Sequence, residues 1–207
     1  MASKFRNAGQ TCVCANRVLV HAPIYDEFAS RLGAAVEALN VGNGMDADAT
    51  TGPLINRAAT EKVAAHIEDA LGKGGKVLFS GKGAQGGNFA RPVIIGEAST
   101  EMRLAHEETF GPVAPLFRFE TEDEAIALAN DTEYGLASYF YTSGLDRAFR
   151  VAEALEAGMI ALNTGSIAME MAPFGGVKQS GLGREGGTLG IEEYLETKAF
   201  HIGGLKI

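Results

Sequence analysis

The stretch Arg17–Leu39, RVLVHAPIYDEFASRLGAAVEAL, carries the pattern that decides the fold. Its opening residues RVLVH form a short β-branched run typical of a strand, and a helical pattern follows directly. Pro23 lies in the first turn of that pattern, where proline is tolerated. The apolar side chains at helical spacing are Ile24, Phe28, Leu32, Ala35 and Leu39. The stretch therefore predicts a strand followed by an amphipathic helix.

The same alternation continues along the chain. Further helices are predicted over Arg57–Leu71, Thr121–Ala129 and Leu145–Leu155, and further strands at KVLF from Lys76, RPVII from Arg91, PVAPLFRF from Pro112, Ala137–Tyr141 and Met159–Asn163. Glu124 lies three residues after Thr121 and is expected to complete a capping box with it. Alternating strands and helices favour an α/β fold with a largely parallel sheet and flanking helices.

The end of the chain, YLETKAFHI (Tyr194–Ile202), alternates apolar and polar residues and predicts one more strand. A strand at a chain end is well placed to complete another sheet, in the same chain or in a neighbouring copy. We therefore expect this C-terminal strand to join another sheet.

Composition excludes several classes of protein. The 207 residues are 46% hydrophobic and 21% charged, which is ordinary for a globular domain. The net charge of −8 argues against a nucleic-acid partner. No apolar run reaches the about 18 residues of a membrane span, and the start has no secretory h-region. With only two cysteines there is no disulfide framework, so a cytoplasmic location is expected.

Two glycine-rich strings imitate a dinucleotide-binding loop. Gly81–Gly86 (GKGAQG) follows a predicted strand, but the next residues, GNFARPV, cannot open the helix that would hold a pyrophosphate. Gly181–Gly186 (GLGREG) lies too near the chain end for a βαβ unit of about 30 residues. Both are better interpreted as turn or packing glycines.

Both cysteines lie in KFRNAGQTCVCANR, residues 4–17. Cys12 and Cys14 lack the two-residue spacer of a zinc knuckle, and the four histidines are scattered, so no metal site is predicted. The run before Cys12 is expected to place it at the opening of a short helical turn, with its N–H free for an oxyanion and Arg6 and Arg17 adding positive potential. The alternative is an inert, buried cysteine.

The cysteine stretch resembles the active-site segment of the aldehyde dehydrogenase superfamily, and is most similar to its succinate-semialdehyde dehydrogenase branch. Four further stretches resemble successive segments of the family, in the family's order. They are EETFGPVAPLFRF from Glu107, NDTEYGLASYFY from Asn130, GMIALNTG from Gly158 and PFGGVKQSGLGREGG from Pro173. Together they span nearly the whole chain.

The resemblance implies a role for each matching residue. Cys12 matches the nucleophile that forms a thiohemiacetal and then a thioester with the aldehyde. Glu108 and Phe110 match the residues that hold the ribose and the nicotinamide of NAD or NADP. Arg6 matches an arginine that pairs with the far carboxylate of an acidic semialdehyde such as succinate semialdehyde. Cys14 is a packed hydrophobe or a redox partner of Cys12.

Two departures from the family pattern matter. Ala168 stands where the branch commonly has a serine that helps to hold the substrate carboxylate, and Ser166 lies two residues earlier. The resemblance further implies that residues 1–190 are the catalytic domain without its cofactor-binding domain, which would carry the general base. Residues 191–207 would be the C-terminal strand through which copies of the chain form a homo-oligomer. We therefore expect this chain alone to be inactive in aldehyde oxidation.

Three functions compete at this point. The first is the catalytic domain of an NAD(P)-dependent aldehyde dehydrogenase for a small acidic aldehyde. The second is a non-catalytic oligomerisation module that uses the C-terminal strand. The third is a cofactor-independent thiol esterase that uses Cys12, for which no histidine base is obviously placed.

Overall fold

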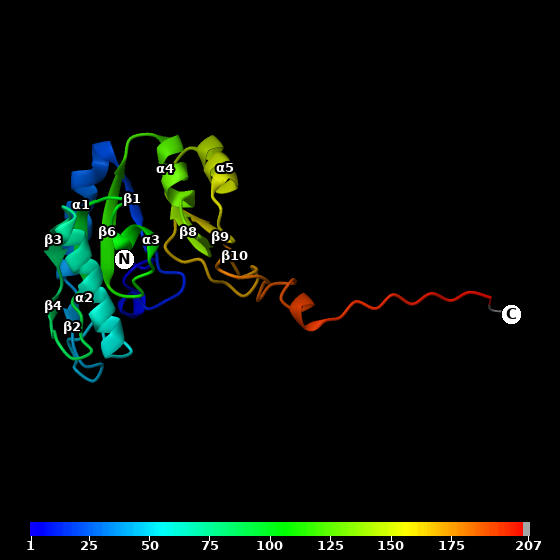
Figure 1. Ribbon diagram of the computed structural model, residues 1–207, viewed down its shortest axis with the longest axis horizontal. Coiled ribbons are helices and arrows are strands. Elements are labelled where there is room, and N and C mark those ends of the chain that lie inside the picture. The colour runs from blue at the N-terminus through cyan, green and yellow to red at the C-terminus, as the bar shows by residue number, and fades with distance from the viewer. Residues whose placement is uncertain (205–207) are drawn as a thin grey trace.

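The computed structural model describes residues 1–204, and its first part is built on a four-stranded sheet (Figure 1). The strand order is β1-β6-β5-β3, with β1 and β5 both parallel to the central β6. The strands are β1 (Val18–His21), β3 (Lys76–Ser80), β5 (Val93–Ala98) and β6 (Val113–Phe119). Edge strand β3 runs antiparallel to β5. The prediction of an α/β fold with a largely parallel sheet is confirmed, with one antiparallel edge.

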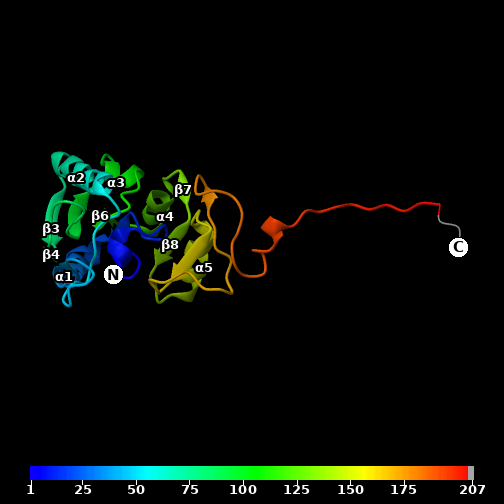
Figure 2. The same ribbon diagram turned by 90° about the horizontal axis from the view of Figure 1, so that it is seen from below.

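Helices cover both faces of this sheet. Helix α1 (Tyr25–Glu37) and helix α2 (Arg57–Gly72) lie on opposite sides of it in Figure 2. Along β5 the side chains alternate between the two cores, because successive residues of a strand point to opposite faces. Ile94 packs with the α1 cluster, whereas Val93 and Ile95 pack with the α2 cluster. Burial on both faces explains why the sequence shows continuous apolar runs at β5 and β6.

The second part of the molecule carries the parallel pair β8 (Ala137–Phe140) and β9 (Met159–Leu162), together with helices α4 (Glu122–Asn130) and α5 (Leu145–Ala154). The Thr121 side chain caps α4 by accepting a hydrogen bond from the backbone N–H of Glu124. The Glu124 carboxylate accepts from the N–H of Glu120, one residue before the cap, so the predicted capping box closes one residue early.

Short elements complete the described chain. They are η1 (Arg6–Gly9), η2 (Ala22–Ile24), β2 (Asn40–Val41), β4 (Lys82–Gly83), α3 (Arg103–His106), β7 (Tyr134–Gly135), β10 (Val177–Lys178) and η3 (Glu192–Tyr194). No helix begins within or directly after Gly81–Gly86, because β4 lies within that string, a turn at residues 87–88 follows it, and β5 comes next. No helix of the described chain is long and apolar enough to cross a membrane.

The C-terminal segment leaves the body of the molecule as an extended tail (Figure 1). Within residues 195–204 no strand pairing is present, and the start of the expected strand, Tyr194, ends the 3₁₀ helix η3 instead. Apolar side chains of the tail are exposed, for example Tyr194 at 82% and Phe200 at 79%. Residues 205–207 of the predicted segment lie outside the described residues. Pairing of this tail with another sheet stays a prediction.

Candidate functional site

The backbone before Cys12 turns sharply through consecutive left-handed residues. Asn7, Ala8 and Gly9 have φ angles of 52°, 56° and 77°. A Cβ atom on Gly9 would lie 2.2 Å from the carbonyl oxygen of Gly111, so only glycine allows this approach. The turn brings the cysteine segment, residues 6–16, against the segment that contains Glu108.

Gln10 fixes this turn from both sides. Its side-chain oxygen accepts a hydrogen bond from the N–H of Ile55 at 2.8 Å. Its side-chain nitrogen donates to the carbonyl of Asn7 at 3.2 Å. The glutamine therefore ties the residues before Cys12 to a loop that is distant in sequence.

Cys12 lies in a hydrogen-bonded reverse turn. The N–H of Cys14 donates to the carbonyl of Thr11 at 2.8 Å, and Cys12 occupies the exposed part of the turn between them. The expected helical turn at Cys12 is thus present only as this single turn, and no helix begins there. Within the described residues the N–H of Cys12 makes no hydrogen bond, so it is available to an oxyanion.

Cys14 is half-buried, and both thiols are free in this structure. The Cys14 sulfur lies 3.9 Å from the carbonyl oxygen of Arg6, which is a weak contact. The two cysteines therefore differ in environment: Cys12 faces solvent, and Cys14 packs under the turn.

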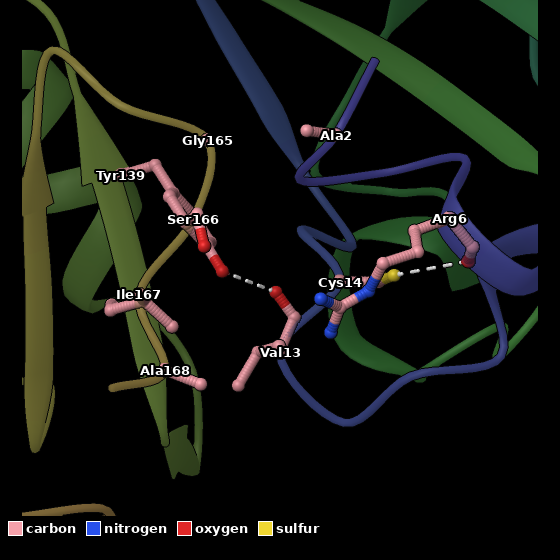
Figure 3. Close-up of a pocket in the computed structure, with 9 residues that line it drawn as sticks. All are labelled: Ala2, Arg6, Val13, Cys14, Tyr139, Gly165, Ser166, Ile167 and Ala168. Carbon is pink, nitrogen blue, oxygen red and sulfur yellow. Dashed lines mark hydrogen bonds between the residues drawn. The ribbon is translucent and has the colours of Figure 1, made fainter. Parts of the chain in front are cut away.

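A small pocket lies beside the turn (Figure 3). Its free volume is about 10 Å³, room for about one water molecule, and its lining comes from Ala2, the cysteine segment, β8 and the loop after β9. The lining residues are Ala2, Arg6, Val13, Cys14, Tyr139, Gly165, Ser166, Ile167 and Ala168. The Arg6 guanidinium has no ion-pair or hydrogen-bond partner among residues 1–204, while the hydroxyl of Tyr139 donates to the carbonyl of Val13 at 2.8 Å. Arg6 and Ala168 thus border one pocket.

Arg17 does not contribute to this site. Its guanidinium donates to the carbonyl oxygens of Leu128 at 2.6 Å and Ala129 at 2.8 Å, at the C-terminal end of α4. A cation at this end of a helix stabilises its unpaired carbonyl groups. The expectation that Arg17 adds positive potential at Cys12 is therefore wrong, because its charge is used to cap α4.

The segment Glu107–Phe110, here called the EETF segment, exposes three of its four residues and buries Thr109. Glu108 is exposed and has no partner among the described residues, and the Phe110 ring is 39% exposed. Thr109 between them is buried, and Phe110 has a left-handed φ of 50°. The segment therefore presents a free carboxylate and an aromatic ring to solvent while Thr109 between them is buried.

A polar cluster beneath the EETF segment holds it in place. His66 is fully buried on α2; its Nδ1 lies 3.1 Å from the Thr109 hydroxyl and its Nε2 lies 3.3 Å from the Glu107 carboxylate. Arg103 binds the same carboxylate through two nitrogens, each at 2.8 Å. Hydrogen bonds from Arg103 and then from His66 lower the pKa of Glu107 to about 2. Burial lowers the pKa of His66, so its neutral form bridges the two residues.

Asn16 links the cysteine segment to the EETF segment. Its side-chain nitrogen donates to the carbonyls of Leu104 at 3.1 Å and Glu107 at 3.0 Å. Its side-chain oxygen accepts from the N–H of Thr109 at 3.0 Å. Sequence reasoning missed Asn16, since a single asparagine before a strand carries no local signal of a long-range bond.

Lys4 is the second residue that the sequence did not indicate. It is only 5% exposed, and burial lowers the pKa of its ammonium group to about 8, although the charges of Cys14 and Glu108 act in the opposite direction. A buried lysine beside a thiol and a carboxylate is therefore part of the environment of the site.

A family model agrees with these observations. The model of the aldehyde dehydrogenase family matches residues 1–200. The chain belongs to the aldehyde dehydrogenase family.

Three similar proteins illustrate the comparison with other aldehyde dehydrogenases. The chain is 57% identical over 206 residues to 3-sulfolactaldehyde dehydrogenase of Pseudomonas putida, covering 99% of this chain and 42% of that protein. It is 56% identical over 204 residues to the NADP(+) succinate-semialdehyde dehydrogenase of Escherichia coli K12, covering 98% and 42%. A crystal structure of aldehyde dehydrogenase from Brucella melitensis biovar abortus superposes with a TM-score of 0.92 at 60% identity, covering 96% and 41%. The chain thus spans less than half the length of these aldehyde dehydrogenases.

Proposed function

We propose that this chain is the catalytic domain of an NAD(P)-dependent aldehyde dehydrogenase that oxidises an acidic semialdehyde, such as succinate semialdehyde, to the dicarboxylate. One observation carries the proposal. An exposed cysteine with an unbonded N–H lies in a fixed turn beside a pocket that contains an unpaired arginine. A nucleophile, an oxyanion donor and an anion-binding group are the parts that covalent capture of an acidic aldehyde requires.

The chemistry follows from Cys12. Its thiolate adds to the aldehyde carbon, and the new C–S bond gives a thiohemiacetal whose oxygen accepts a hydrogen bond from the Cys12 N–H. Oxidation of that carbon leaves a thioester, and water then breaks the C–S bond to release the acid and the free thiol. NAD(P)⁺, when bound, supplies the hydride acceptor for the oxidation.

The exposed groups of the EETF segment fit a nicotinamide cofactor. The Glu108 carboxylate is free to accept hydrogen bonds from ribose hydroxyls, and the exposed Phe110 ring is free to contact the nicotinamide. Either NAD or NADP satisfies this arrangement, and the Escherichia coli relative is named for NADP.

The pocket supports an acidic substrate. Arg6 can pair with a carboxylate at the end of the substrate that is distant from the aldehyde. Two of the relatives are named for aldehydes that carry an anionic group, a sulfonate in one and a carboxylate in the other. Ser166 borders the same pocket as Ala168, so we propose that it supplies the hydroxyl that the alanine lacks.

The first experiment is the intact mass of the protein after brief exposure to p-nitrophenyl acetate. The wild type and Cys14→Ala are expected to gain one acetyl group, and Cys12→Ala none. An adduct of equal yield on Cys12→Ala would contradict the assignment of the nucleophile.

The substrate class is tested by protection of Cys12 from acetylation. Succinate semialdehyde should protect Cys12 more strongly than the neutral aldehyde butanal, and Arg6→Gln should remove the difference. Equal protection by both aldehydes in the wild type would contradict an acidic substrate. Because no residue of this chain is assigned as the general base, its NAD(P)H production should stay far below the about 1–10 s⁻¹ of ordinary enzymes.

Cys14 is proposed as a redox partner of Cys12. Peroxide would oxidise the two thiols to a disulfide, with two water molecules as the other product, and block the nucleophile reversibly. Thiol counting after peroxide treatment, with Cys14→Ala as the control, tests this. If reversal by dithiothreitol is the same in the variant and the wild type, Cys14 has no such role.

We also propose that copies of this chain form a homo-oligomer through residues 191–207. The exposed apolar side chains of the tail support this, since such surfaces mark protein–protein contacts. The two free thiols support a cytoplasmic location.

A further inference from the structure

Asn16 makes three hydrogen bonds to the region of Glu108. Its carboxamide donates to the carbonyls of Leu104 and Glu107 and accepts from the N–H of Thr109. The bonds to Glu107 and Thr109 fall on the two residues that flank Glu108. A carboxamide has two donor hydrogens and one acceptor oxygen, and here each of them is used.

The partners of Asn16 are held from the opposite side. His66 and Arg103 bind the Glu107 carboxylate, and His66 also binds the Thr109 hydroxyl. The EETF segment is therefore tied to α2 and α3 through the side chains of Glu107 and Thr109, whereas its backbone is bound by Asn16. What Asn16 adds is the connection to the cysteine segment.

The cysteine segment is itself held close to Asn16. The N–H of Ala15 donates to the carbonyl of Ser3 at 2.7 Å, and the Val13 carbonyl accepts from Tyr139. Only three residues separate Cys12 from Asn16, so a shift of the asparagine is transmitted to the turn that carries the thiol. A displacement of about 1 Å between reacting groups lowers rates by up to about 10²-fold.

We propose that Asn16 is a positioning residue: its carboxamide fixes the cysteine segment against the EETF segment and so sets the spacing between Cys12 and Glu108. The inference rests on the proposed function for the roles of these two residues. The connection itself is independent of that function, because it is defined by hydrogen bonds within the chain.

Asn130 offers a matched control. It is partly buried like Asn16, and it also links two segments, with its side-chain nitrogen donating to Ala154 O at 2.8 Å and its oxygen accepting from Glu156 N at 2.9 Å. Asn130→Ala therefore removes bonds of the same kind away from the EETF segment. A loss of stability alone would affect both variants in the same way.

The test compares Asn16→Ala and Asn130→Ala in the full chain by hydrogen exchange and by Cys12 acetylation. Asn16→Ala should raise exchange at least tenfold in peptides that cover residues 11–15 and 107–110, and slow acetylation about tenfold. Asn130→Ala should leave the exchange of these peptides and the rate of Cys12 acetylation within twofold of the wild type. It should raise exchange near residues 154–157 instead.

The outcomes separate the inference from the function. Unchanged exchange at residues 107–110 in folded Asn16→Ala, or equal acetylation in the two variants, would overturn the positioning role. If the wild type itself is not acetylated, the proposed function fails and the exchange measurement alone decides the inference. If Asn16→Ala does not fold, Asn16→Ser, which keeps a shorter donor and acceptor, replaces it, with the same exchange changes expected at reduced size.

Discussion

Replacing Lys4 with methionine should make this chain more stable at neutral pH. Lys4 is 5% exposed, and burial lowers the pKa of its ammonium group from the ordinary 10.5 to about 8. At about 1.4 kcal/mol per pKa unit, the charged lysine costs about 3 kcal/mol of folding free energy below pH 8. Methionine keeps the length of the side chain and removes the charge, so the variant should be more stable by about 3 kcal/mol at pH 7.

The sign of the pH dependence follows from the direction of this pKa shift. The folded state releases the proton near pH 8, whereas the unfolded state keeps it to about 10.5. The cost of the charge is therefore complete below pH 8, falls between pH 8 and 10.5, and is absent above that range. The advantage of Lys4→Met should shrink across the same window.

Urea unfolding followed by circular dichroism, with reductant present, measures this difference between pH 7 and pH 10. Lys62→Met is the control, because Lys62 is exposed on α2 and its replacement should change stability little at any pH. The reasoning is refuted if Lys4→Met is no more stable than the wild type at pH 7. It is equally refuted if the advantage is the same at pH 7 and pH 10.

Three further predictions can be tested with stability and mass measurements. Gly9→Ala should lower the free energy of unfolding by about 3 kcal/mol, because Gly9 has a positive φ and the added Cβ atom would clash with Gly111. Gly72→Ala is the control, since a Cβ atom at Gly72 meets no neighbour, and it should change the free energy of unfolding little. Urea titrations measure both. Glu107→Gln should lower the free energy of unfolding by about 1 kcal/mol at pH 7 and leave it unchanged near pH 2. The effect is small because the Glu107 carboxylate is half-exposed. Acid titration of both proteins by circular dichroism checks that the difference in stability is present only above the lowered pKa of Glu107. Removing residues 191–207 should convert an oligomer into a monomer in light scattering, and an unchanged mass would contradict a role of the tail in assembly.

Much of the fold was predictable from hydrophobic periodicity. The strands β5 and β6 are apolar on both faces because α1 and α2 cover opposite sides of the sheet, and this burial is visible as continuous apolar runs in the sequence. The antiparallel direction of β3 was not predictable, because the direction of an edge strand depends on the path of the connecting chain. The unpaired tail after Tyr194 was likewise not predictable, since its alternating pattern describes a strand without naming its partner.

The candidate site was predictable only in part. The stretch around Cys12 resembled a known segment, and the free N–H of that cysteine agrees with the expectation. The reverse turn around it depends on the approach of Gly9 to Gly111, a contact between segments about a hundred residues apart. Local sequence patterns do not predict a contact between segments so far apart in the chain. For the same reason the sequence suggested that Arg17 belongs to the site, whereas the fold directs its charge to α4.

The distribution of backbone strain argues that the site is held in one conformation. Among residues 1–204, six residues other than glycine have a positive φ, and three of these lie in the cysteine segment or the EETF segment: Asn7, Ala8 and Phe110. Each such residue costs on the order of 1 kcal/mol and persists only where its surroundings determine the conformation fully. Hydrogen bonds hold these residues in their strained conformations. Gln10 makes them before the cysteine turn, and Asn16 and His66 make them around the EETF segment. Strain opposed by several fixed bonds is how a protein keeps reactive groups in place before a substrate arrives, so loosening those bonds should reduce reactivity before it unfolds the chain.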